Sequence, residues 1–282
     1  MNADKIVHER PAKWIEWLAR FGYAAKGVVY LIVGILAFQA AFNWGGRVTG
    51  SEGAFRTIAN QPFGKVLLFI VGVGLLGYVV WRFVEALRDP EHNDSGFSAF
   101  GRRLSYFVSG LIYASLAFVA LQIVFSSPGG GSGSGSGGGG GDSTSEGTAT
   151  LLSQPFGQWL VGFVGVAIVA YGFYNFYKAY STKFRRHLKL AQMSPAEEKW
   201  ATRIGRFGLA AKGVVSVIIG YFFIQAARAS NPSQARTTEG ALQAIQQQPY
   251  GAWLMGLVAL GLIAYGIHLG VQARYRRISP AR

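Results

Sequence analysis

The chain has 282 residues, of which 50% are hydrophobic and only 14% are charged, with a formal net charge of +14 at pH 7 and no cysteine. The absence of cysteine excludes disulfides, thiolate metal sites and iron–sulfur clusters. A soluble domain of this size would spread its apolar residues over amphipathic patterns, whereas here they gather in long blocks, which indicates an integral membrane protein.

Six apolar blocks follow one another along the chain, and each can cross a hydrocarbon layer of about 30 Å at about 1.5 Å per helical residue. No block alternates apolar and polar residues, as a strand of a membrane barrel must. The first block is too long for the apolar part of a signal peptide. We therefore predict an all-α polytopic membrane protein with transmembrane helices at Phe21–Phe42, Phe63–Val84, Leu104–Phe125, Phe156–Tyr177, Phe207–Ala227 and Tyr250–Val271.

The positive charge is distributed unevenly between the two ends of these helices. Of the 27 Lys and Arg, 18 fall in the segments on one side and three in the loops on the other. Basic residues stay on the cytoplasmic side during insertion, so both termini are predicted to be cytoplasmic. The basic segment Lys183–Lys189 leaves nucleic-acid binding as an alternative. We expect a solvated loop that faces lipid headgroups, and no nucleic-acid partner.

A ten-residue motif recurs along the chain. Residues 20–29 are Arg-Phe-Gly-Tyr-Ala-Ala-Lys-Gly-Val-Val, residues 206–215 differ from them at one position, and a looser copy starts at Arg103, with Ser109 in place of Lys. We predict three two-helix units, namely repeat 1 (17–90), repeat 2 (97–182) and repeat 3 (194–277), with a cytoplasmic lead-in (1–16) and tail (278–282). Units of two spans enter in one orientation and can close around a pseudo-threefold axis.

The outer loops share a second signature. A hydroxyl residue, Glu and Gly are followed by Gln-Pro-aromatic-Gly at 61–64, 154–157 and 248–251, and a tyrosine stands 14 residues past each last glycine. A carboxylate at a helix N-terminus meets unsatisfied N–H groups, so Glu52, Glu146 and Glu239 are predicted to cap short amphipathic helices on the outer surface. Proline is expected at the first position of each even-numbered transmembrane helix.

Three segments lie outside this pattern. Ser194 and Glu197 flank a proline in a capping box, which predicts a basic helix that runs into the fifth span. Lys13-Trp14 matches Lys199-Trp200, so repeat 1 is expected to have a similar interfacial lead-in. The Gly/Ser-rich segment 128–141 is predicted to be a flexible linker in the outer loop of repeat 2.

Taken together, these motifs resemble the bacterial membrane proteins of family number 1206 in the domain-of-unknown-function series. The resemblance covers the chain from about Trp17 to Arg276 and rests on several motifs that recur in order. It implies a six-helix protein of the bacterial plasma (inner) membrane and brings no catalytic residues to transfer. Repeat 2 departs most from the pattern, through Ser109 and the glycine insertion.

Charged residues inside a membrane are functional candidates because they are costly to bury. The blocks contain no acidic residue apart from Glu85 at a cytoplasmic edge, which disfavours a proton- or sodium-coupled carrier. Lys26 and Lys212 lie about 8 Å inside the cytoplasmic boundary by helical rise. We expect both to snorkel to headgroups and the tyrosines to join the interfacial belt or bond between helices. The alternative is a polar ring that favours an anionic headgroup or solute, formed by Lys26, Lys212, Tyr78, Tyr171, Tyr265, Arg82 and Asn175.

Other kinds of site find no support. The four histidines lack paired ligand spacing and the serines lack a His–Asp partner, so we predict no metal, no cofactor, no catalytic residue and no enzymatic activity. Two functions remain, a transport-like bundle that binds or passes a small solute or lipid, and a structural or accessory subunit of a membrane complex. The expected partners are the lipid bilayer, anionic lipid headgroups and another membrane protein. A continuous polar axis would favour the first function, and an apolar packed axis the second.

Overall fold

The computed structural model of the chain describes residues 13–88, 97–125, 147–182, 184–185 and 188–276. Over these residues the fold is helical, and the only β-type pairing described is an isolated bridge between Leu188 and Arg276. Six of the described helices are long and apolar enough to cross a membrane, which confirms the predicted fold class. They are α1 (Lys13–Ala41), α3 (Gly64–Arg88), α4 (Phe97–Phe125), α6 (Gly157–Ser181), α7 (Pro195–Ala229) and α9 (Gly251–Tyr275).

Helices α1 and α7 begin well before the predicted apolar blocks. The capping box forms as predicted, because the Ser194 hydroxyl accepts from the Glu197 backbone N–H while the Glu197 carboxylate accepts from the Ser194 N–H. Helix α1 starts at Lys13, the counterpart of Lys199 in α7. Exposed tryptophans mark both extensions, with Trp14 and Trp17 on α1 and Trp200 on α7. The predicted linker at 128–141 lies outside the described residues.

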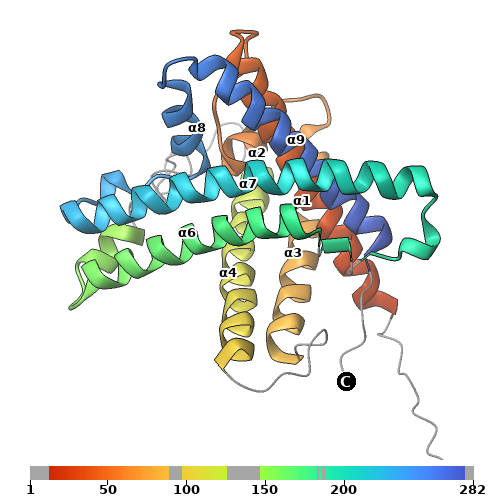
Figure 1. Ribbon diagram of the computed structural model, residues 1–282, viewed down its shortest axis with the longest axis horizontal. Coiled ribbons are helices and arrows are strands. Elements are labelled where there is room, and N and C mark those ends of the chain that lie inside the picture. The colour runs from red at the N-terminus through yellow and green to blue at the C-terminus, as the bar shows by residue number, and fades with distance from the viewer. Residues whose placement is uncertain (1–12, 89–96, 126–146, 183, 186–187, 277–282) are drawn as a thin grey trace, which may run out of the picture.

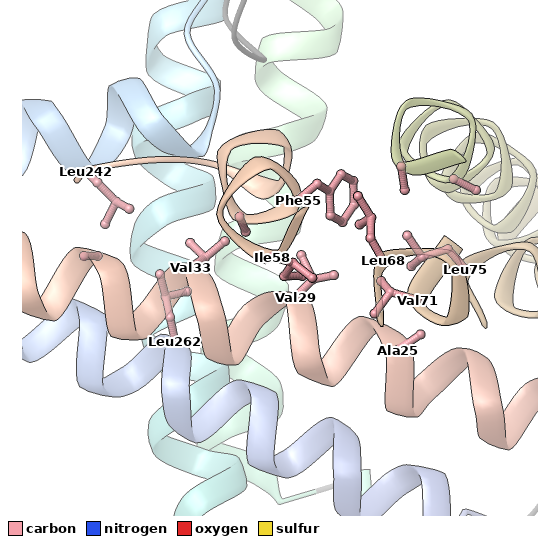
Figure 2. Packing of buried hydrophobic residues seen from close by; sticks show 14 of the residues in the cluster. Ala25, Val29, Val33, Phe55, Ile58, Leu68, Val71, Leu75, Leu242 and Leu262 are labelled. Carbon is pink, nitrogen blue, oxygen red and sulfur yellow. The ribbon is translucent and has the colours of Figure 1, made fainter. Parts of the chain in front are cut away.

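Two short helices, α2 (Ser51–Ala59) and α8 (Thr238–Gln246), connect the transmembrane helices of repeats 1 and 3, and two 3₁₀ turns lie at Leu190–Gln192 and Pro232–Gln234. We expected short amphipathic helices in these loops, and α2 is such a helix, with its apolar face turned into the bundle. Phe55 and Ile58 of α2 are buried, and Figure 2 shows them beside Leu68 and Val29. Because α2 is amphipathic, it packs this one face against α1, α3 and α4.

The Gln-Pro-aromatic-Gly motif forms a tight turn before each even-numbered helix. The proline was predicted to open the helix, but α3, α6 and α9 each begin at the glycine two residues later. The aromatic residue between them is left-handed, with φ of 59° at Phe63, 64° at Phe156 and 60° at Tyr250. A Cβ on Gly64 would lie 1.9 Å from the Ile58 carbonyl oxygen, so the motif needs glycine for this close approach.

The long helices lie side by side in three pairs, α3 with α4, α6 with α7 and α9 with α1, and Figure 1 shows the first two pairs running in different directions. Each pair joins the second helix of one repeat to the first helix of the next, and the last repeat closes on the first. Glycines permit close contact in two pairs. A Cβ on Gly27 would lie 2.9 Å from the Gly266 oxygen, and one on Gly213 would lie 3.0 Å from the Gly172 oxygen. This cyclic pairing is the arrangement expected of three repeats around a pseudo-threefold axis.

A large cluster of apolar side chains packs between the long helices and the short helices α2 and α8. We call this cluster the outer core, and Figure 2 labels ten of its members. Its residues come from α1, α2, α3, α4, α7, α8 and α9, so it joins all three repeats. In Figure 2 the labelled members are Ala25, Val29, Val33, Phe55, Ile58, Leu68, Val71, Leu75, Leu242 and Leu262.

Candidate functional site

The bundle holds a cluster of two buried lysines surrounded by tyrosines. We name it the lysine–tyrosine cluster, and it comprises Lys26, Lys212, Tyr30, Tyr78, Tyr113, Tyr171 and Tyr265. Lys26 is 5% exposed and Lys212 is 9% exposed. We expected both side chains to snorkel to headgroups, but both ammonium groups point into the bundle, where tyrosines surround them.

Lys26 and the two tyrosines that contact it form one part of this cluster, which we call the first station. Its Nζ donates to the Tyr78 hydroxyl at 3.1 Å and lies 4.6 Å from the centre of that ring. The ring of Tyr113 lies on another side of the ammonium, at 4.3 Å. Tyr78 and Tyr113 meet edge to face, with ring centres 4.8 Å apart. Stacking of an ammonium on aromatic faces stabilises it where water is excluded.

Lys212 occupies the matching station of repeat 3. Its Nζ donates to the Tyr265 hydroxyl at 3.0 Å, and the rings of Tyr265 and Tyr30 lie 4.5 and 5.3 Å away. Tyr30 and Tyr265 also meet edge to face at 4.8 Å. Each station therefore takes its lysine and one tyrosine from one repeat and its second tyrosine from the next repeat in the cycle.

The third station is incomplete. Ser109 stands where the other repeats have lysine, and Tyr171, the counterpart of Tyr78 and Tyr265, lies 5.5 Å from Lys212 instead. Asn175 is buried, but its side-chain amide donates to the Tyr171 backbone carbonyl at 2.8 Å, a hydrogen bond within α6. The predicted ring thus contains both lysines and all three tyrosines, whereas Asn175 belongs to it only by position.

Arg82 links the cluster to an ion-pair network near the C-terminus of α3. Its Nε donates to the Tyr78 hydroxyl at 2.7 Å and its Nη1 to Glu85 at 2.6 Å. Glu85 is 1% exposed and also accepts from Arg276 of α9 at 3.0 Å. Arg82 is thereby neutralised locally, while no ion pair with a carboxylate is found for Lys26 or Lys212 among the described residues.

Tyr30 and Tyr113 belong to the site but were not predicted as members of it. They hold equivalent positions in repeats 1 and 2, one helical turn beyond Lys26 and Ser109, while repeat 3 has Ser216 there. Their register in the repeats was a visible signal. What the sequence could not supply is the cyclic pairing, which brings Tyr30 of repeat 1 to the lysine of repeat 3.

The arginine that opens the recurring motif has a structural role. Arg20 donates to the backbone carbonyl of Ala273 at 2.9 Å and to that of Arg274, at the C-terminus of α9. Arg206 donates to the carbonyl of Ala179 at 3.0 Å, at the C-terminus of α6. Each arginine therefore caps the helix that precedes it in the cycle, where the last carbonyls lack intrahelical partners.

Glu52 and Glu239 lie in the first turns of α2 and α8, but no side-chain hydrogen bond is made at either N-cap. The N-cap positions of α2 and α8 are Gly50 and Thr237, and neither makes a side-chain capping hydrogen bond. Glu52 lies in the first turn, where the helix dipole favours a carboxylate, and pairs with Arg56 at 3.0 Å. Glu239 accepts from Gln243 at 3.4 Å. Glu146 lies outside the described residues.

The remaining candidates fall outside the cluster. Within the described part of the chain, no three His, Asp or Glu side chains gather as metal ligands. His268 is buried beside Phe184, and its Nε2 lies 2.7 Å from the amide nitrogen of Gln272. In the basic segment 183–189, Phe184 and Leu188 are buried and Arg185 pairs with Glu198. These described residues are packed on the bundle, unlike the solvated loop that we expected.

The cluster offers hydrogen-bond donors that would suit an anion. An ammonium group has three N–H donors, and one tyrosine hydroxyl accepts from each lysine. The tyrosine hydroxyls can donate in turn. Two lysine ammonium groups that have further N–H donors and are shielded from bulk water favour an anionic group such as phosphate or carboxylate.

Comparison with known proteins agrees with the repeat architecture. Three tandem segments, residues 21–89, 104–182 and 207–276, match the family described as Domain of Unknown Function (DUF1206). The chain is also 34% identical over 275 residues to the uncharacterized protein YxxB of Bacillus subtilis (strain 168), which covers 97% of this chain and 95% of that protein. No solved structure matches. With all three of its two-helix repeats matched, the chain belongs to the DUF1206 family of proteins with membrane-spanning helices.

Proposed function

We propose that this protein binds a small anionic group, as a transport-like bundle for a solute or lipid, and that it does so without catalysing a reaction. The observation that carries the proposal is the pair of buried lysines, each hydrogen-bonded to tyrosine and without an ion pair to a carboxylate among the described residues. We place the protein in a bacterial plasma membrane with the lysine–tyrosine cluster toward the cytoplasm, because basic residues crowd that end of the helices.

Energetics support this proposal. A buried ion without a counter-charge costs several kcal/mol even after relaxation, and stacking on tyrosine recovers about 0.5–2 kcal/mol per contact. One such lysine would lower the stability of the fold, and two at matching positions of repeats 1 and 3 would incur this cost twice. A bound anion removes the cost by supplying charge and hydrogen-bond acceptors to both ammonium groups.

The access route follows from the distribution of polarity. The outer core seals the outer half of the axis with apolar side chains from all three repeats. An anion would therefore reach the cluster from the cytoplasmic end or from the bilayer in this conformation. Passage to the outside would require the outer core to repack, which is the kind of alternation that repeat-built transporters use.

Thermal unfolding in detergent tests the proposal, with sodium phosphate compared against sodium chloride at equal ionic strength. A ligand that binds only the folded state stabilises it by mass action. We expect phosphate to raise the unfolding temperature of the native chain and of Lys199→Met, an exposed control. The rise should disappear in Lys26→Met and Lys212→Met. Equal rises in all four proteins, or none in the native chain, would contradict the proposal.

The second candidate function is an accessory subunit of a membrane complex. The apolar outer core favours it, since a closed axis needs no substrate. The exposed apolar faces of α4 and α6 could then cover another membrane protein, with Phe118 and Phe163 as examples of residues more than two-thirds exposed. Under this function phosphate leaves the unfolding temperature of the native chain unchanged, so the same experiment separates the two.

A further inference from the structure

The two helices of repeat 2 do not pack against each other as those of repeats 1 and 3 do. Helix α1 packs on α3 and α7 packs on α9, but α4 and α6 share no comparable interface within the described residues. The ring of helices, closed elsewhere by the pairs described above, is therefore open between α4 and α6.

Small residues explain the packing in repeats 1 and 3. A Cβ on Gly22 would lie 2.6 Å from the Tyr78 backbone nitrogen, and one on Gly208 would lie 2.4 Å from the Tyr265 nitrogen. No side chain fits at such distances, so the helices meet through backbone contact. Repeat 2 has Ser105 at this position, and Ser105 is exposed.

A second contact changes in the same way. A Cβ on Gly74 would lie 2.5 Å from the Ala25 side chain, and one on Gly261 would lie 2.2 Å from that of Ala211. Repeat 2 has Ala167 in place of these glycines and Val108 in place of these alanines. Val108 is 44% exposed, whereas Ala25 and Ala211 are buried. Both contact points have gained side-chain atoms, so α4 and α6 cannot approach as their counterparts do.

The opening leads to the lysine–tyrosine cluster. Tyr78 and Tyr265 are 0% and 6% exposed, whereas Tyr171, their counterpart on α6, is 44% exposed. The ring of Tyr171 nevertheless lies 5.5 Å from the ammonium of Lys212. A molecule that touches Tyr171 from outside the bundle is therefore one aromatic ring away from a buried cation.

We propose that an anionic phospholipid of the cytoplasmic leaflet enters sideways between α4 and α6 and places its phosphate against Lys212. This inference rests on the proposed function and names its ligand class. Leu104, Val108 and Leu111 of α4 are apolar and exposed, and Val108 stands where repeats 1 and 3 have the alanine that contacts the second helix of the repeat. A free solute would have to cross hydrocarbon to use this route, whereas a lipid keeps its chains in the bilayer and moves only its headgroup.

The charge at the cytoplasmic edge suits an anionic headgroup. Lys178 of α6 lies one turn beyond Tyr174 and stacks on that ring at 4.8 Å. A headgroup passing from the leaflet surface toward Lys212 would therefore meet Lys178 first. Lys212 lies about 8 Å deeper than the boundary by helical rise, a depth that a phosphate can reach by a modest dip into the membrane.

Spin-labelled lipids in phosphatidylcholine vesicles that contain the full chain test this inference. We expect labelled phosphatidylglycerol to be immobilised several-fold more than labelled phosphatidylcholine. The preference should vanish in Lys212→Met and in Val108→Trp, which fills the opening. The matched control is Val28→Trp on the exposed face of α1, which should retain the preference. Val108 faces lipid, so its replacement should leave the unfolding temperature nearly unchanged; if it does not, Ser105→Trp serves as the second blocking variant.

The outcomes separate this inference from the proposed function. Val108→Trp should still be stabilised by inorganic phosphate, which reaches the cluster from the cytoplasmic end. Equal immobilisation of both lipids by the native chain, with phosphate stabilisation intact, would overturn lipid entry and leave anion binding standing. Loss of both effects in the native chain would overturn both proposals. A dimer in which cross-links join α4 and α6 of two copies would also overturn lipid entry, because a second copy would then cover the opening.

Discussion

Repeats 1 and 3 differ from repeat 2 in what their helices do for the bundle. In repeats 1 and 3, glycine brings the two helices into backbone contact and lysine is buried between tyrosines. In repeat 2 the glycine is Ser105, the lysine is Ser109, and the two helices pack on their neighbours instead of on each other. The fold tolerates this divergence because the pairs between repeats hold α4 to α3 and α6 to α7. A repeat can therefore lose its internal interface without loss of the fold, as the proposed entry between α4 and α6 requires.

Removing the buried carboxylate should have the largest effect. Glu85→Gln leaves Arg82 and Arg276 without their shared anion, in a network that ties repeat 1 to repeat 3. Breaking a buried ion pair costs about 3–5 kcal/mol, so we expect a large fall in unfolding temperature. The control is Glu52→Gln in the exposed pair with Arg56, where the expected cost is below about 1 kcal/mol. Equal shifts in the two variants would contradict the importance of this network.

A matched pair of leucine substitutions tests the packing difference directly. Gly208→Leu forces a side chain into backbone contact with Tyr265, and overpacking of this kind costs about 1–3 kcal/mol. Ser105→Leu places the same side chain at the equivalent position of repeat 2, which is exposed, so we expect a change within about 0.5 kcal/mol. Thermal unfolding in detergent measures both. A loss in Ser105→Leu as large as that in Gly208→Leu would show that α4 and α6 do pack closely.

The sequence was informative wherever a pattern depends on the solvent or on a local motif. Hydrocarbon as solvent requires long apolar helices, so all six were predicted, and the capping box at Ser194 placed the start of α7. Internal repetition predicted the matching positions of Lys26 and Lys212. These inferences need no knowledge of which helix packs on which.

Features that depend on partners distant in sequence were not predictable in the same way. Snorkelling was expected of Lys26 because the sequence does not reveal that Tyr113 lies within reach of it. The prolines of the outer loops were expected to open helices, and only the fold shows that Gly64 must pass beneath Ile58. The pairing of each repeat with the next depends on contacts between helices of different repeats, and no local signal encodes it.

Ser109→Lys would complete the third station, and of the variants discussed here it should change the stability of the fold least. Ser109→Lys would place an ammonium near Tyr171, and because Ser109 is only partly buried, the cost of burying this charge should be smaller than at Lys26 or Lys212. The opening beside α4 also lets a long side chain find water or headgroups. We expect the phosphate-dependent rise in unfolding temperature to exceed that of the native chain.

Ser109→Met is the control for this variant, because it adds comparable length without charge and should leave the phosphate effect at its native size. If Ser109→Lys instead responds to phosphate no more than Ser109→Met, the third station does not face the same space as the other two. The lysine–tyrosine cluster would then be two separate sites, and the opening between α4 and α6 would reach only the site of Lys212. That result would confine lipid access to repeat 3 and leave Lys26 to be reached from the cytoplasmic end.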